Sequence, residues 1–399
     1  MRAHYDPSVM TRLRWLTAGE SHGPALVVIV EGMPAGLPIG ASDVDRDLAR
    51  RQQGYGRGGR MKIEHDHCEI QSGVRGGETL GSPIALRIAN RDFANWTDRM
   101  GAEPFATPPE RVTRPRPGHA DLAGGLKYDR RDLRDVLERA SARETAARVA
   151  AGALARVLLR ACGVEVASRV VAIAGVCDTA ERTPESLVRF RDAIDDSSLR
   201  VMDPEIEAKM RERIYTLSHD GDTAGGIVEA VAIGVPPGLG SYVQWDRKLD
   251  GRIAQAIASV HAIKAVEIGD GWGSAAREGS AVHDAIGYDA NARRFTHATN
   301  RAGGLEGGVS NGEPVVVRAA MKPIPTLRKP LASVDIDSKA PTDAAHERSD
   351  VCAVPAASVV VEAMLALVLA DALLEKFASD SMTELARALA GYRAQVEAY

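Results

Sequence analysis

The chain has 399 residues, enough for about two to four domains of ordinary size or for one unusually large domain. It carries 50 basic and 54 acidic residues, a formal net charge of −4, and 45% of its residues are hydrophobic, which excludes a disordered or fibrous protein and indicates a soluble globular one. Aromatic residues make up only 4% of the chain, which argues against a nucleic-acid platform of stacked aromatics.

The sequence predicts no contact with a membrane. Its longest uninterrupted apolar run, residues 363–370, is far shorter than the roughly 18 residues of a membrane-spanning helix. Residues 1–15 scatter Arg, His, Asp and Pro where a secretory signal would carry an apolar block, so we expect a cytoplasmic protein. The four cysteines lie far apart without a C-x-x-C pair, which argues against a zinc knuckle or a disulfide framework.

Local signals predict the helices in chain order. Ser42 fits the N-cap of a helix over 43–53, and Gly54 fits the position after its end. Apolar residues at helical spacing predict one long helix of roughly 30 residues, from about 133 to 161. Pro355 suits the first turn of a second long apolar helix, which ends near residue 377. Shorter helices are expected after the pairs Thr183-Pro184 and Asp203-Pro204 and after the capping box of Ser381 and Glu384.

Several segments resemble strands that do not alternate regularly with these helices. This order favours antiparallel or mixed sheets packed on central helices over a doubly wound parallel sheet. We therefore predict an α+β fold, a layered β-α-β sandwich with long central helices between mostly antiparallel sheets. The predicted strands lie near 61–70, 82–89, 164–174, 226–235, 264–268 and 313–320.

The sequence also contains an internal duplication. Residues 23–37 and 225–239 share an apolar strand followed by Gly, an apolar residue, Pro, a small residue, Gly and Leu, at a constant offset of 202. Residues 76–87 and 307–318 also resemble each other, and a long Ala-rich helix follows each. We predict one large domain over 1–399, made of two halves related by a pseudo-twofold axis. The halves cover about 13–163 and 215–378, with an insert at about 164–214 and a C-terminal helix at about 381–399.

Three segments are locally basic although the whole chain is acidic. Residues 46–62 carry six basic residues and one acidic, residues 111–148 ten and six, and residues 318–329 four and none. If the fold brings these segments together, they form a cationic pocket suited to a small polyanion. A nucleic-acid track would more often make a whole domain basic, so we expect no nucleic-acid partner. Three unrelated solvated faces remain the alternative from composition alone.

Two glycine motifs match known patterns in the wrong context. The G-x-G-x-x-G match that starts at Gly54 follows a helix and precedes a strand, the reverse of a dinucleotide-binding fingerprint. We interpret it as a flexible loop that places Arg57 and Arg60 over an anion. The G-x-S-x-G match around Ser310 is followed by a strand, which argues against a nucleophile elbow.

The histidines that stand out fall into two groups. His65 and His67 have metal-ligand spacing, but no partner motif is obvious elsewhere, so a solvated strand face is the favoured interpretation and no metal is expected. His22 lies in a small-residue turn before a buried strand, and His119 lies in a Pro- and Gly-stiffened loop among arginines. Two loop histidines beside cations could supply acid chemistry on a phosphate. A structural hydrogen-bonding role for each remains the alternative.

A series of motifs follows in order along the chain: TAGESHGP, RRQQGYGRGGRM, RPGHAD, SARET, GLGSYVQWDRKLD, GGVSNG, KPIPT and RSD. Together they resemble the chorismate synthase family, from about Arg14 to the C-terminus without large gaps. The resemblance implies a β-α-β sandwich, usually a homotetramer. It implies an enzyme of the shikimate pathway that converts 5-enolpyruvylshikimate 3-phosphate into chorismate and phosphate. The implied reaction is an anti 1,4-elimination that requires reduced FMN without a net redox change.

The resemblance also assigns roles by position. His22 would act on the reduced flavin as proton donor, His119 would donate toward the departing phosphate, and Asp350 would work with flavin N5 to remove the ring proton. Arg51 and Arg57 also match the positions assigned to NADPH in members that reduce their own flavin. The implied substrate-binding arginines, with Arg60 of the glycine loop added, are Arg51, Arg57, Arg60, Arg116, Arg143 and Arg348. The implied FMN contacts are Ser141, Ala142, Arg143, His261, Ala262, Gly307, Lys322, Pro323, Ile324, Pro325, Thr326 and Arg348.

Position 261 departs from the family pattern, in which Asn is expected. No fused reductase domain is evident, so the chain resembles the monofunctional type, which relies on an external flavin reductase or another source of reduced flavin. A flavin-dependent oxidoreductase acting on a small polyanion is the alternative, and it predicts lasting flavin oxidation. An RNA-binding protein built on the RGG-like loop would instead predict salt-sensitive RNA binding.

Overall fold

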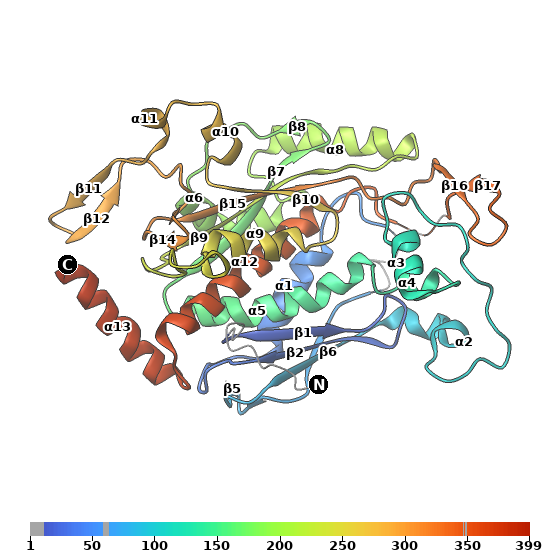
Figure 1. Ribbon diagram of the computed structural model, residues 1–399, viewed down its shortest axis with the longest axis horizontal. Helices are drawn as coiled ribbons and strands as arrows, with labels where there is room; N and C mark the ends of the chain where they lie inside the picture. The colour runs from blue at the N-terminus through green and yellow to red at the C-terminus, as the bar shows by residue number, and fades with distance from the viewer. Residues whose placement is uncertain (1–11, 59–63, 346, 348) are drawn as a thin grey trace.

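Two antiparallel sheets enclose a layer of long helices in the computed structural model (Figure 1). The structure describes residues 12–58, 64–345, 347 and 349–399. The four-stranded sheet has the order β1 (Arg14–Ala18), β2 (Ala25–Glu31), β6 (Ile84–Ala89) and β3 (Cys68–Ile70). The five-stranded sheet has the order β10 (Ile263–Ile268), β15 (Val315–Met321), β9 (Gly226–Ile233), β7 (Glu165–Ile173) and β8 (Val176–Cys177). The predicted α+β sandwich is confirmed.

The middle layer consists of α1 (Ala41–Gln52), α5 (Thr145–Ala161), α9 (Leu249–Ala258) and α12 (Val354–Phe377). α12 is long and apolar enough to cross a membrane, but 94% of its most apolar window is buried inside the protein, so it is a core helix. α5 crosses α12 closely at Gly152. A Cβ atom at this position would lie only 2.4 Å from the Cβ of Ala363, so glycine is what allows the close approach. In the middle of α12, the fully buried Glu362 accepts two hydrogen bonds from Arg50 of α1.

The proline and capping signals position several helices as predicted. Pro355 lies in the first turn of α12. Thr183 and Asp203 cap α6 (Pro184–Arg189) and α8 (Pro204–His219) with their side chains. The capping box at Ser381 opens α13 (Met382–Ala398). The remaining elements are β4 (Val74–Arg75), β5 (Glu78–Thr79), η3 (Arg91–Asn95), α2 (Thr97–Met100), α3 (Asp121–Tyr128), α4 (Arg134–Leu137), η4 (Ala142–Glu144), α7 (Arg191–Asp196), η5 (Trp245–Arg247), α10 (Gly271–Ala275), α11 (Gly279–Val282), β11 (Ile286–Asp289), β12 (Arg294–His297), β13 (Leu305–Glu306), β14 (Val309–Ser310), β16 (Ala332–Val334) and β17 (Pro341–Asp343).

The predicted long helix over 133–161 is wrong as one continuous helix. α4 ends at Leu137, and η4 and α5 begin only at Ala142 and Thr145. Ser141 has an extended backbone (ψ 142°), and its hydroxyl accepts a hydrogen bond from the N–H of Arg143. Serine competes for backbone donors in this way, which makes it a cap in place of an interior helix residue.

Two further boundaries differ from the prediction. Gly40, not Ser42, is the N-cap of α1, because the carboxylate of Asp43 accepts a hydrogen bond from the N–H of Gly40 at 3.0 Å. The strand expected over 61–70 covers only β3 among the described residues, since His65 and His67 precede its first residue and 59–63 lie outside the described part.

The two halves have the same order of elements. β2 is followed by a turn and α1, and β9 is followed by a turn and α9. Both turns use glycines with positive φ at the matching positions, Gly32 and Gly36 (94° and 83°) and Gly234 and Gly238 (76° and 87°). Each half continues with a short hairpin, β4–β5 or β13–β14, and a strand that pairs antiparallel with the first, β6 or β15. Superposition of the halves about a twofold axis stays a prediction.

Candidate active site

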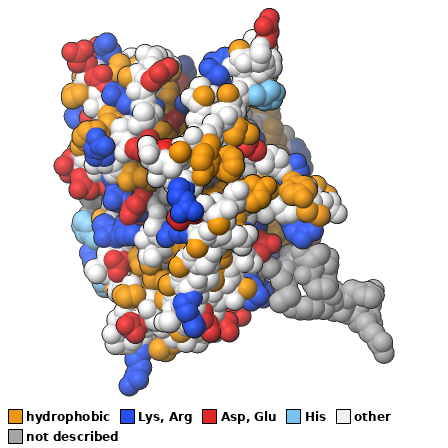
Figure 2. Space-filling view, turned by 90° about the vertical axis from the view of Figure 1, so that its left-hand side faces the viewer, with side chains coloured by type: hydrophobic (Ala, Val, Ile, Leu, Met, Phe, Trp, Pro, Cys, Tyr) orange, Lys and Arg blue, Asp and Glu red, His pale blue; other side chains and the backbone are white. Residues whose placement is uncertain are grey.

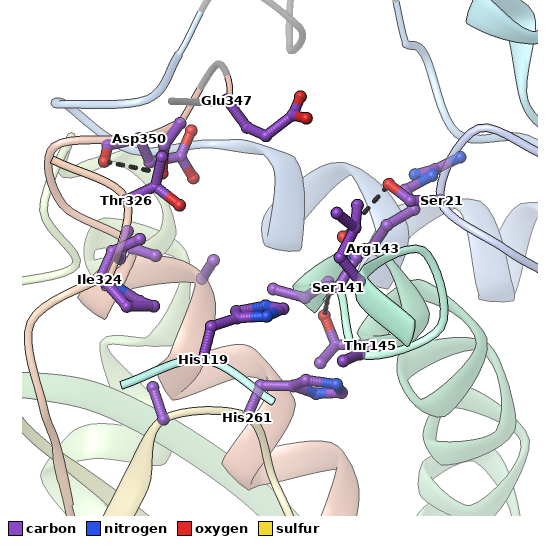
Figure 3. A pocket seen from close by; sticks show the side chains of 18 of the residues that line it. Ser21, His119, Ser141, Arg143, Thr145, His261, Ile324, Thr326, Glu347 and Asp350 are labelled. Atoms are coloured by element: carbon purple, nitrogen blue, oxygen red, sulfur yellow. Dashed lines mark hydrogen bonds between the residues drawn. The ribbon is translucent and has the colours of Figure 1, made fainter. Parts of the chain in front are cut away.

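A cavity of about 560 Å³ opens beside the N-terminal end of α12, where the interrupted helix α4–α5 faces loops from the second half. Figure 3 shows Asp350, Thr326 and Ile324 on one side, Ser21, Ser141 and Arg143 on the other, and the imidazole of His119 between them. The residues expected from the sequence that line this cavity are His22, Arg51, Arg57, Arg116, His119, Ser141, Ala142, Arg143, His261, Ala262, Lys322, Ile324, Pro325, Thr326 and Asp350.

All three basic segments of the sequence meet at this cavity. Residues 46–62 supply Arg51 and Arg57, residues 111–148 supply Arg116 and Arg143, and residues 318–329 supply Lys322. The structure therefore favours the cationic pocket over three separate solvated faces. Concentrated cations in a cleft attract small anions.

The break between α4 and α5 places Arg143 beside Arg51. Arg143 donates from Nη1 to Asp66 at 2.6 Å, while its Nη2 is buried without a hydrogen-bond partner. Arg51 donates to Thr145 and to the carbonyl oxygen of Ala142. Burial lowers the pKa of Arg51 to about 9, with the charges of Arg143 and Arg57 adding to the shift and Asp66 opposing it. Asp66 also lies 3.5 Å from Arg51, and Glu64 lies 3.8 Å from Nη2 of Arg143, so buried carboxylates balance part of this positive charge. The unused hydrogen-bond donor at Nη2 is what an anionic ligand could engage.

His119 is hydrogen-bonded to a buried carboxylate. Its Nδ1 lies 2.5 Å from Oδ1 of Asp121, the first residue of α3, and Asp121 also accepts hydrogen bonds from the backbone N–H, Nε and Nη2 of Arg116. Arg116 also donates to the hydroxyl of Thr326 at 3.1 Å. One carboxylate therefore holds a histidine and an arginine at the cavity wall.

His22 has a similar arrangement. Its Nδ1 lies 2.9 Å from Oε1 of Glu138, and its ring stacks on Trp96 with centroids 4.0 Å apart. Burial would raise the pKa of Glu138, but the hydrogen bonds and charge of His22, with Arg134, lower it. Arg134 also reaches Glu347 at 3.1 Å and lies over the ring of Trp96. Glu138 lies in the break after α4 and is buried, so the interrupted helix also fixes His22.

Asp350 lies on the side of the cavity with Thr326 and Ile324 (Figure 3), and hydrogen bonds and an ion pair connect it to the glycine loop. Its Oδ2 is 2.9 Å from Nη1 of Arg57, and its Oδ1 accepts the backbone N–H of Gly58 at 2.6 Å. A Cβ atom on Gly58 would lie 2.9 Å from the carbonyl oxygen of Ser349, so only glycine permits this close approach. The loop thus positions both a carboxylate and an arginine. Arg60 and Arg348 lie outside the described residues.

The comparisons with known proteins agree with one another. A family model described as chorismate synthase matches residues 13–374. The chain belongs to the chorismate synthase family. It is 61% identical over 374 residues to the chorismate synthase of Desulforudis audaxviator, covering 94% of this chain and 95% of that protein. It is 53% identical over 398 residues to that of Aquifex aeolicus, covering 97% and 99%.

A solved structure described as "Crystal Structure of Chorismate Synthase" has a TM-score of 0.79 and 44% sequence identity, covering 97% of this chain and 99% of that chain. The protein is accordingly an enzyme of the lyase class, as the name of the chorismate synthase family implies. Its mixed helix and sheet architecture is that of its structural neighbour.

His261, the position at which the chorismate synthase resemblance led us to expect Asn, lies in the cavity wall. Burial lowers its pKa to about 4, with Arg148 adding to the shift and Glu144, at 3.9 Å, opposing it. The imidazole is therefore neutral at pH 7, and its Nδ1 is buried without a hydrogen-bond partner. A neutral imidazole can donate or accept one hydrogen bond, as an Asn amide can.

Two expected flavin contacts lie away from this cavity. Gly307 lines a second, separate cavity of about 350 Å³ with Ser274, His283 and Arg301. Pro323 does not line the main cavity; it packs close to Gly225, on which a Cβ atom would lie 2.9 Å from Cδ of the proline. Whether either residue contacts a flavin stays a prediction.

Sequence reasoning missed the residues that hold the histidines. Asp121 stands out in the sequence only as the last residue of the RPGHAD motif. Glu138 and Trp96 carry no sequence signal, because their contacts with His22 span more than 70 residues of sequence. His67 of the His65–His67 pair contacts Asp45 at 2.6 Å, and the described residues contain no group of three or more His, Cys, Asp or Glu side chains that could hold a metal ion.

Proposed function

We propose that the chain converts 5-enolpyruvylshikimate 3-phosphate into chorismate and inorganic phosphate by an anti 1,4-elimination in the shikimate pathway. The observation that carries this proposal is the cavity, where cationic side chains from three segments line the same space as His119, which is paired with the carboxylate of Asp121, and Asp350. Loss of a phosphate and a proton from one ring needs a cation-rich wall, an acid and a base.

The residues fit a flavin. The buried Nδ1 of His261 and Nη2 of Arg143 lack hydrogen-bond partners and belong to side chains of the cavity wall. Lys322 and Thr326 from the proline-stiffened segment, and Ser141 from the interrupted helix, also line the cavity and offer further donors and acceptors. Reduced FMN, when bound, supplies electron density for loss of an allylic phosphate, which side chains do poorly.

In this mechanism His119 donates a proton to the phosphate as its C–O bond breaks. Asp350 receives the ring proton, the electron pair of that C–H bond forms one new ring double bond, and the existing ring double bond shifts by one position as the C–O pair leaves with the phosphate. His22 would hold a proton beside the bound flavin. Arg51, Arg57, Arg116 and Arg143 bind the phosphate and carboxylates, for which the guanidinium fork is suited. Arg60 and Arg348 are proposed to join them, and Arg51 and Arg57 are also the proposed NADPH positions.

We further propose that an external flavin reductase or another donor supplies reduced flavin in the cytoplasm, and that the chain assembles as a homotetramer. Hydrophobic side chains are exposed among charged ones on the face that carries α13 and the β11–β12 hairpin (Figure 2), including Ile286 at 69% and Tyr288 at 56% exposure. Such surfaces often become buried in an assembly. Size-exclusion chromatography with light scattering should give a molecular mass four times that of the chain.

An anaerobic assay tests the reaction. Purified protein with substrate and photoreduced FMN should release chorismate and phosphate in equal amounts, and the flavin should still be reduced at the end. Equal turnover with oxidised FMN in air and no reductant would contradict the proposal. Lasting flavin oxidation that tracks substrate use would indicate an oxidoreductase instead.

A further inference from the structure

The carboxylate of Asp121 is completely buried at the start of α3 and takes part in four polar contacts. Three are hydrogen bonds from Arg116, through the backbone N–H at 3.1 Å, Nε at 2.8 Å and Nη2 at 3.1 Å. The fourth, and the shortest, is the 2.5 Å contact with Nδ1 of His119.

This short contact requires a proton between the two atoms, since a carboxylate oxygen and a bare imidazole nitrogen would repel each other. Burial would raise the pKa of Asp121, but the hydrogen bonds from His119 and Arg116 and the charge of Arg116 outweigh it and hold that pKa well below its usual range. The proton therefore resides on Nδ1 of the ring, not on the carboxylate.

A rival arrangement exists, because Nη2 of Arg116 lies 3.1 Å from the same Nδ1. A guanidinium only donates, so this bond would need a bare Nδ1 and a proton on Nε2. That tautomer would turn the lone pair of Nδ1 toward Asp121 at 2.5 Å, which the buried anion opposes.

We propose that Asp121 is a positioning residue, which keeps a proton on Nδ1 of His119, so that the ring takes up and releases its second proton at Nε2 and, when doubly protonated, donates from Nε2 to the departing phosphate. The role in catalysis rests on the proposed elimination, whereas the tautomer does not. Arg116 donates hydrogen bonds to the same carboxylate. The side chain of Asp121 therefore positions both the proposed acid, His119, and a cation, Arg116.

The other charged or titratable groups around His119 do not replace this carboxylate. Lys322 donates to the carbonyl oxygen of the residue before His119, and His261 lies beside His119 (Figure 3), whose charge helps to lower the pKa of His261. Within the described part of the chain, Asp121 is the carboxylate that hydrogen-bonds to His119. Asp121→Asn keeps the shape but offers an amide N–H to Nδ1, which favours the opposite tautomer.

Nitrogen NMR of the full-length protein labelled with 15N-histidine, without flavin or substrate, tests the tautomer. The His119 signals are assigned by their loss in His119→Gln. In the neutral ring we expect the proton on Nδ1 in the wild type and on Nε2 in Asp121→Asn. A wild-type ring protonated on Nε2 would overturn the proposal, even if the variant failed to fold.

Kinetics with reduced FMN tests the role in the reaction. Asp121→Asn should lower kcat by about 10² to 10⁴, the usual contribution of a positioned acid, and change KM only a few-fold, with partial recovery in Asp121→Glu. Asp135→Asn, the same change at an exposed pair with Arg130, should leave kcat unchanged. Near-normal kcat in Asp121→Asn would overturn the positioning role. Absence of phosphate release by the wild type would contradict the proposed function and leave the NMR result standing.

Discussion

His119 and Asp350 line the same cavity, and each is held by partners that suit its role in the proposed elimination. We expect His119→Ala and Asp350→Ala each to lower kcat by about 10² to 10⁴, because each removes the acid or the base of the proposed reaction. FMN affinity should stay within a few-fold. Steady-state assays with reduced FMN and a flavin titration of each variant provide the measurements.

The isotope effect separates the two roles. With substrate deuterated at the ring position, the effect on kcat should grow in Asp350→Ala, because proton removal then limits the rate. A variant that keeps near-normal kcat, or that loses activity only because it no longer folds or binds flavin, shows that the role given to its residue is wrong.

His261 links the cavity to the pH dependence of stability. Its pKa is lowered from 6.5 to about 4 by burial, so as the pH falls from 6.5 toward 4 the unfolded chain binds a proton that the folded chain does not. The free energy of unfolding should therefore fall over this window, and it should fall less in His261→Asn. Urea titrations at several pH values measure this, with the exposed His219→Asn as control. Parallel curves for His261→Asn and wild type would contradict the lowered pKa.

For single residues, the sequence alone predicted those that belong to motifs but not the side chains that bind them. His119 and Arg116 could be named because they belong to one short motif. Asp66, which binds Arg143 from a different segment, could not, because only the packed fold brings the two together. The neutral state of His261 likewise depends on burial, which a loop sequence does not reveal.

Helices that begin at a strong local signal were predicted correctly. A helix end that depends on a side chain competing for backbone hydrogen bonds was not. Pro355 and the box at Ser381 determine helix starts through local chemistry alone. Around Ser141 the periodicity continues through the break, so apolar spacing favoured one helix, while the hydroxyl bond to Arg143 ends it. The helix prediction therefore fails at the cavity, where the interruption of the helix lets residues 141–143 line the wall.

The crossing of α5 and α12 gives a prediction about packing. Gly152→Ala should lower the free energy of unfolding by about 1 to 2 kcal/mol, because a Cβ 2.4 Å from that of Ala363 overpacks the core by more than the gain of about 1 kcal/mol in helix propensity. Gly391→Ala in α13, where nothing lies within 4 Å of the new Cβ, should raise it by about 0.5 to 1 kcal/mol. Urea unfolding measures both. A Gly152→Ala variant as stable as Gly391→Ala would refute the tight crossing.

Across the whole molecule, the cavity draws on both halves of the chain. Arg51 and Arg143 come from the first half, and His261, Lys322 and Asp350 come from the second. The duplication in the sequence indicated two matching halves, but not which edges meet, because that depends on how α5 and α12 pack between the sheets. A cationic site on an anionic body is the result of that packing.

This charge distribution predicts how the enzyme responds to salt. The described lining has five cationic side chains against the carboxylates of Glu347 and Asp350, while the chain as a whole carries −4. Raising the ionic strength from about 0.02 M to about 0.5 M shortens the screening length to a few ångströms, so kcat/KM for the anionic substrate should fall roughly tenfold. The value of kcat at saturating substrate should change little, because bound charges inside the cavity are screened less. Lys322→Gln should reduce the salt slope, whereas Lys127→Gln on the exposed surface of α3 should leave it unchanged. A slope equal in all three proteins would show that the cavity charges do not guide substrate binding.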